Sequence, residues 1–143
     1  MYSLLVFTAT EVFTFSRSKD PALMVYFNKN LNIINHYCEK DQYRNPFMTS
    51  VTFGKMKMTG AIAHCEPKAN GFKLVFEKRY WDGLTDLNKT QLMMHEMAHC
   101  MFDENHYDDP THFMYSFMNT IDGLSLAIQV HNYFTLKCGN KSG

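Results

Sequence analysis

The feature that most constrains the fold is a pair of histidines, His95 and His99, four residues apart in a helical pattern that begins near Asn88. Residues at this spacing on an α-helix differ by about 40° around the axis and by one turn along it. Both imidazoles therefore project from the same face. Gln91, three residues after Asn88, is placed to complete a capping box at the start of the helix. The sequence thus predicts a helix that carries two imidazoles side by side.

Glu96 directly follows the first histidine of this pair. Its side chain projects about 100° away from that of His95, so it can reach a water molecule beside the imidazoles without becoming a ligand. Two neutral imidazoles with an open coordination position suit zinc, which lowers the pKa of a bound water. We therefore expect one zinc ion per chain, with Glu96 as the general base that acts on the zinc-bound water.

A third protein ligand is needed, and His106 is the candidate that we favour. If the helix continued to His106, this residue would lie about 16 Å along the axis from His95, too far for one ion to bind both. The helix must therefore end after about Phe102, and the chain must turn back. Asn105 accepts the left-handed conformation at such an end more readily than Asp103. Asp103 stays open as a rival ligand, because it continues the same helix face. Weaker rivals are Asp108, Asp109 and His112.

The string His95-Glu96-Met97-Ala98-His99-Cys100, followed by a third histidine and by Phe113-Met114-Tyr115, resembles a metzincin-type zinc metallopeptidase. It is similar to small metallopeptidases of bacteriophages and bacteria, and the resemblance covers roughly residues 72–118. The common metzincin motif has one residue fewer between its second and third histidines, and a glycine at the turn. This chain has no glycine there, and His112 stands where the family usually has serine.

This resemblance implies a role for each residue that matches the motif. The zinc ligands that it implies are His95, His99 and His106. Glu96 would be the general base, and Met114 would form the methionine turn beneath the metal. Tyr115 would join Glu96 in the active site by lining the specificity pocket. The strand at residues 72–77 would be the sheet edge that pairs with an extended substrate.

The rest of the pattern predicts an α+β fold, the arrangement of a minimal metzincin-like zincin. We expect a small mixed sheet of about three to four strands, packed on an N-terminal helix and an active-site helix, with a C-terminal helix. Helices are expected over residues 20–39, 88–102 and 120–136. Strands are expected over residues 7–15, 47–53, 58–64 and 72–77, with a hairpin loop at 66–71 and a connection that contains Gly83 at 81–88. The last helix should bury Leu124, Ala127, Ile128, His131 and Phe134.

Length and charge limit the class of protein. A chain of 143 residues fits one domain, which we expect to span residues 1–143. The formal net charge is +0 with no basic run, which argues against nucleic acid as a partner. No stretch is long enough to cross a membrane. The apolar N-terminus lacks a basic start and is interrupted by Glu11, so we expect a strand rather than a signal peptide, and we favour a cytoplasmic location.

Four cysteines are scattered along the chain without a C-x-x-C pair: Cys38, Cys65, Cys100 and Cys138. They could form two disulfides or remain as thiols. Because a chain of this length can bury a core without cross-links, we expect thiols. Cys100 points about 100° away from the neighbouring His99, so we expect it to help pack its helix against the rest of the protein.

These observations favour an enzyme, a zinc-dependent endopeptidase that hydrolyses peptide bonds in proteins or peptides. One alternative is a non-catalytic zinc-binding interaction or regulatory domain on a zincin-like scaffold. Another is a helical, aromatic-rich virion or regulatory protein without a metal. Glu96 favours catalysis, because a purely structural zinc site has no need of it. The oligomeric state stays open.

Overall fold

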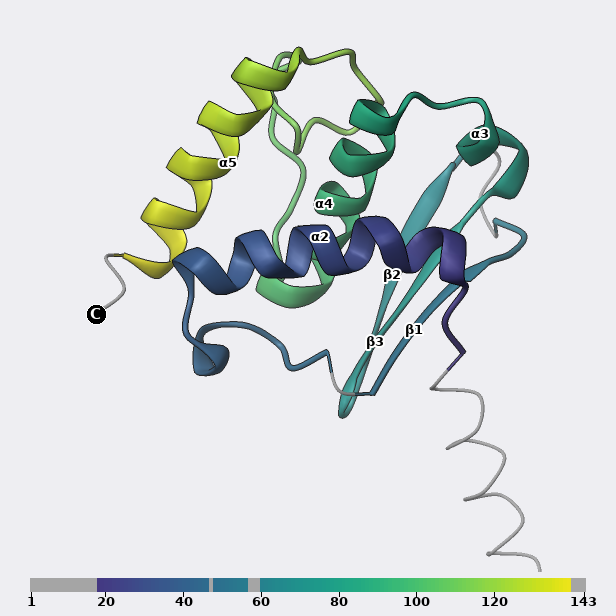
Figure 1. The fold of residues 1–143 in the computed structure, drawn as a ribbon, viewed down its shortest axis with the longest axis horizontal. Coiled ribbons are helices and arrows are strands. Elements are labelled where there is room, and N and C mark those ends of the chain that lie inside the picture. Colours follow the sequence, from purple (N-terminus) through teal and green to yellow (C-terminus); the bar gives the residue numbers. More distant parts are fainter. Residues whose placement is uncertain (1–17, 47, 57–59, 140–143) are drawn as a thin grey trace, which may run out of the picture.

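The computed structural model describes residues 18–46, 48–56 and 60–139, and within these residues the fold is α+β (Figure 1). This confirms the expected fold class. The strands are β1 (Met48–Phe53), β2 (Ala63–Lys68) and β3 (Gly71–Phe76). The helices are α2 (Pro21–Tyr37), α3 (Lys78–Asp82), α4 (Asp86–Phe102) and α5 (Gly123–Cys138), with a short 3-10 helix at Lys40–Gln42. The strand expected at residues 7–15 lies outside the described residues.

The sheet is mixed, and β3 lies at its centre: β1 pairs with β3 in parallel, and β2 pairs with β3 antiparallel. The expectation that residues 72–77 form the edge near the site is therefore wrong. The strand expected at 58–64 is also displaced, because β2 runs on to Lys68 and leaves only residues 69 and 70 for the hairpin turn. Pro67 is compatible with β2 because an edge strand can place a missing N–H on its unpaired side.

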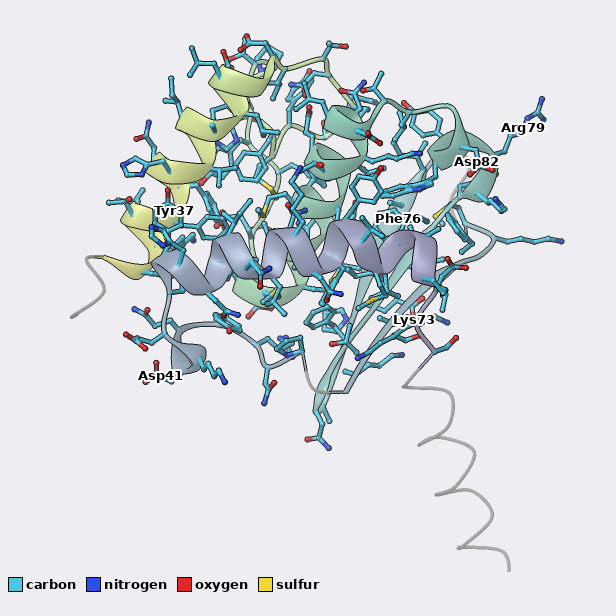
Figure 2. All side chains as sticks on the ribbon, viewed as in Figure 1. Tyr37, Asp41, Lys73, Phe76, Arg79 and Asp82 are labelled. Atoms are coloured by element: carbon cyan, nitrogen blue, oxygen red, sulfur yellow. A yellow bond between two sulfur atoms is a disulfide. The ribbon has the colours of Figure 1, made fainter. Side chains whose placement is uncertain are left out.

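The helices pack against the sheet and against one another, and together they enclose one apolar core. α4 packs on β2 and β3, α2 packs on β1 and α4, and α5 packs on α2. The sheet contributes alternate side chains of β3 to this core, all fully buried: Phe72, Leu74 and Phe76. Figure 2 labels Phe76 on the sheet, and it also shows Tyr37 where the end of α2 meets α5. The ring of Tyr37 stacks there on Phe134 at 6.0 Å between centroids.

The first and last residues of α4 determine the positions of His95 and His99 within the helix. The helix begins earlier than expected, since Thr85 is its N-cap and accepts a hydrogen bond from the N–H of Asn88. Gln91 is consequently not a capping residue but a buried one. The helix ends at Phe102, as expected. The left-handed residue that follows is Asp103, with φ 52°, and not Asn105.

The cysteines form two disulfides, so the expectation of free thiols is wrong. Cys38–Cys138 joins the end of α2 to the end of α5, and Cys65–Cys100 joins β2 to α4. Cys100 is thus covalently bonded and does not merely pack. Although the sequence spacing leaves the pairing open, the fold brings each pair to the separation that a disulfide requires.

Two further expectations about helices need correction. The connection at residues 81–88 contains the end of α3, whose N-cap is Glu77. The buried face of α5 is also different from the expected one, because Leu124 is 73% exposed and Ile128 is 52% exposed. The side chains that α5 buries are Leu126, Val130, Tyr133, Phe134 and Cys138. Among the described residues, no helix is long and apolar enough to cross a membrane.

Candidate metal centre and cleft

Three histidines come together at the C-terminal half of α4. His95 and His99 project from the helix, and His106 is returned to them by the turn that begins at Asp103. One nitrogen from each ring lies within 4.8 Å of the other two. The Nε2 atoms of His95 and His99 are 3.0 Å apart, and the ring of His106 lies 5.2 Å from that of His95. The predicted end of the helix therefore brings the three predicted ligands to one place.

The rival ligands lie elsewhere. Asp103 pairs with the guanidinium of Arg44 at 3.0 Å, and its side chain is 73% exposed. Asp109 accepts hydrogen bonds from the backbone N–H and the hydroxyl of Thr111. His112 stacks on the ring of Tyr107 at 4.4 Å between centroids. None of these residues belongs to the group of three nitrogens found among the described residues.

Hydrogen bonds to backbone carbonyls set the tautomers of the two helical histidines. Nδ1 of His95 lies 2.7 Å from the carbonyl oxygen of Phe113, and Nδ1 of His99 lies 2.5 Å from that of Glu104. Because a carbonyl can only accept, each Nδ1 must carry the proton, and each Nε2 is left with a lone pair. Reasoning from sequence missed Phe113 and Glu104, since a backbone carbonyl leaves no mark on the residue type.

Both rings are held in the neutral form. Burial lowers the pKa of His95 to about 4, and burial likewise lowers the pKa of His99. Neither ring then offers a proton to the other across the 3.0 Å between the Nε2 atoms. Two lone pairs at this distance repel each other unless a cation lies between them. Tetrahedral zinc with bonds of about 2.0–2.1 Å would place its nitrogen ligands about 3.4 Å apart, so the group fits such an ion.

Glu96 lies beside this group and is almost completely buried, with 5% of its surface exposed. Its Oε1 is 4.0 Å from Nε2 of His95. Burial raises the pKa of Glu96 to about 8. A carboxyl group at this distance can exchange a proton with a molecule held next to the three imidazoles.

A cleft of about 620 Å³ opens onto His95, Glu96 and His106. One wall is the segment 60–64, which leads into β2, and the other includes residues 115–118. Tyr115 therefore lines the cleft, and its ring contacts that of Phe117 at 5.9 Å between centroids. Met114 is fully buried in the preceding turn, where its carbonyl accepts a hydrogen bond from the N–H of Tyr107.

The chain matches a known protein family over most of its length. A family model described as "Putative phage metallopeptidase" matches residues 32–134, which include α4, the three histidines and most of α5. No curated protein matches the chain.

Proposed function

Because the chain belongs to the Putative phage metallopeptidase family, we propose that it hydrolyses peptide bonds with one zinc ion held by His95, His99 and His106. One observation carries this proposal: two neutral imidazoles direct lone pairs at each other across 3.0 Å, with a third imidazole beside them. This arrangement is unfavourable in the absence of a cation, and three imidazoles with a free position are a common zinc-binding set in enzymes.

The residues around the ion have distinct tasks. When bound, zinc supplies Lewis acidity that polarises a carbonyl and activates a water. The positive charge of a bound zinc would favour the carboxylate form of Glu96 and so oppose the effect of its burial. That carboxylate would take a proton from the attacking water and give it to the nitrogen of the leaving amine as the peptide C–N bond breaks. The buried position of Glu96 keeps bulk water from competing for that carboxylate. Tyr115 lines the wall of the cleft and contacts the substrate side chain.

The substrate is a protein or peptide in an extended conformation. β2 pairs with β3 on one side, and on its other side it pairs with no strand among the described residues. Its first residues, Ala63 and His64, line the cleft. An extended peptide that adds to this free edge places its backbone along the cleft and beside the three histidines. In this proposal β2 takes the role that the family resemblance implied for the strand at residues 72–77.

Zinc analysis and a hydrolysis assay test the proposal together. Purified protein should contain one zinc per chain and cleave a peptide library, and a chelator should abolish the cleavage. His95→Ala and His99→Ala should lose zinc, whereas His131→Ala, a histidine exposed on α5, should retain it. Full zinc occupancy in either of the first two variants would show that the metal binds elsewhere.

Glu96→Gln separates the enzyme from a non-catalytic zinc-binding domain on the same scaffold. The variant should keep its zinc, because the carboxylate is not a ligand, and should lose on the order of 10² to 10⁴ in hydrolysis rate. A wild-type chain that binds zinc and cleaves no peptide would favour the non-catalytic domain. Unchanged hydrolysis in Glu96→Gln would assign the general base to another residue.

A further inference from the structure

α5 carries three polar residues at intervals of four, Gln129, Tyr133 and Lys137, which we call the α5 polar row. Residues four apart lie on one face of a helix. Each member of the row bonds to the chain between residues 104 and 113, the same segment that supplies the two carbonyls bonded to His95 and His99. α5 itself contributes no residue to the group of three histidines.

Gln129 holds Phe113, the residue whose carbonyl orients His95. Its Oε1 accepts a hydrogen bond from the N–H of Phe113 at 2.9 Å, and its Nε2 donates to the carbonyl of Thr111 at 2.7 Å. One side chain thus bridges two backbone groups of the turn. The carbonyl of Phe113 is the acceptor of the Nδ1 proton of His95. Gln129 and the ring of His95 are therefore linked through one residue, Phe113.

Tyr133 and Lys137 hold the residue that orients His99. The hydroxyl of Tyr133 donates to Oε2 of Glu104 at 2.9 Å, and the ammonium of Lys137 lies 2.5 Å from the same oxygen. The side chain of Glu104 is only 13% exposed, so these contacts are largely shielded from water. The carbonyl of Glu104 accepts the Nδ1 proton of His99. This residue is thus bonded to α5 through its side chain and to His99 through its backbone.

A disulfide and aromatic packing hold the α5 polar row in place. The residue after Lys137 is Cys138, which the disulfide to Cys38 ties to the end of α2. Tyr133 is buried, and its ring packs against that of Phe113 at 5.4 Å between centroids. Partners that fix the orientation of a metal-bound imidazole commonly change metal affinity on the order of 10- to 100-fold when they are removed.

We propose that the α5 polar row positions the zinc ligands: Gln129 orients His95 through the backbone of Phe113, and Tyr133 with Lys137 orients His99 through Glu104. This inference rests on the proposed zinc site. The three members are positioning residues, and none of them touches the metal or the substrate. The C-terminal helix then contributes to metal affinity, although the binding motif lies entirely upstream of it.

The test is the zinc dissociation constant of the full chain, measured by competition with a chromophoric chelator. Tyr133→Phe and Gln129→Met should each weaken zinc binding on the order of 10- to 100-fold. Tyr26→Phe is the matched control for Tyr133→Phe, because its hydroxyl also donates to a carboxylate, that of Asp86 at the far end of α4. Asn132→Ala is the control on the exposed face of α5. Both controls should bind zinc as the wild type does.

A second measurement separates positioning from general destabilisation. In the metal-free protein, the NMR signal of the Nδ1 proton of His99 should shift in Tyr133→Phe, and that of His95 should shift in Gln129→Met. Neither signal should move in Tyr26→Phe, even if its melting temperature falls. Wild-type zinc affinity in both row variants would overturn this inference alone. A wild-type chain that binds no zinc would overturn the proposed function, and this inference with it.

Discussion

Removing the two disulfides one at a time should destabilise the protein by different amounts, because the bridges close loops of different length. The cysteines of Cys65–Cys100 are 35 residues apart, and those of Cys38–Cys138 are 100 residues apart. In the chain-entropy model, a bridge stabilises the folded state by restricting the unfolded chain. This model assigns about 3.8 kcal/mol to the shorter loop and about 4.7 kcal/mol to the longer one.

The assay is urea unfolding of the zinc-free protein, with each cysteine pair replaced by alanine. With an m-value of about 2 kcal/mol per molar urea, both midpoints should fall by about 2 M, and the Cys38/Cys138 variant should fall further. Reduction of the wild type should lower its midpoint below that of either variant. Equal midpoints for wild type and both variants, or a clearly larger loss for the shorter loop, would refute the entropic reasoning. Because disulfides persist in oxidising compartments, a large loss on reduction would weigh against the cytoplasmic location that we favour from the sequence.

Two more predictions concern the helix that carries the histidines. His106→Ala should weaken zinc binding far more than Asp103→Ala in a chelator competition, since Asp103 is paired with Arg44 and points into solvent; the reverse order would make Asp103 the ligand. Thr85→Ala should cost about 1 kcal/mol in the free energy of unfolding, because it removes the N-cap of α4, and it should leave zinc affinity unchanged. Thr120→Ala, an exposed threonine outside the helices, serves as its control in urea unfolding, and equal losses in the two variants would contradict a capping role.

The local spacing of the histidines was enough to predict α4, the helix that holds two of the proposed zinc ligands. The interval from His95 to His99 places two imidazoles on one face, and the impossibility of reaching His106 along the same helix set its end near Phe102, where the structure has it. Apolar residues at intervals of two along the strands, and of three and four along the helices, likewise predicted an α+β fold. These features depend on the geometry of a single element, which is the same in any protein.

Only the tertiary structure decided how those elements meet. The central place of β3, the partners of Cys65 and Cys100, and the burial of Tyr133 in place of Leu124 depend on contacts between segments far apart in the chain. The left-handed turn at Asp103 is accompanied by its ion pair with Arg44, which no local preference predicts. The carbonyls of Phe113 and Glu104 that orient the histidines belong to the backbone, so the residue types at these positions do not reveal them. The motif from His95 to His99 could therefore be identified from the sequence, whereas the contacts that hold its side chains in position depend on tertiary packing.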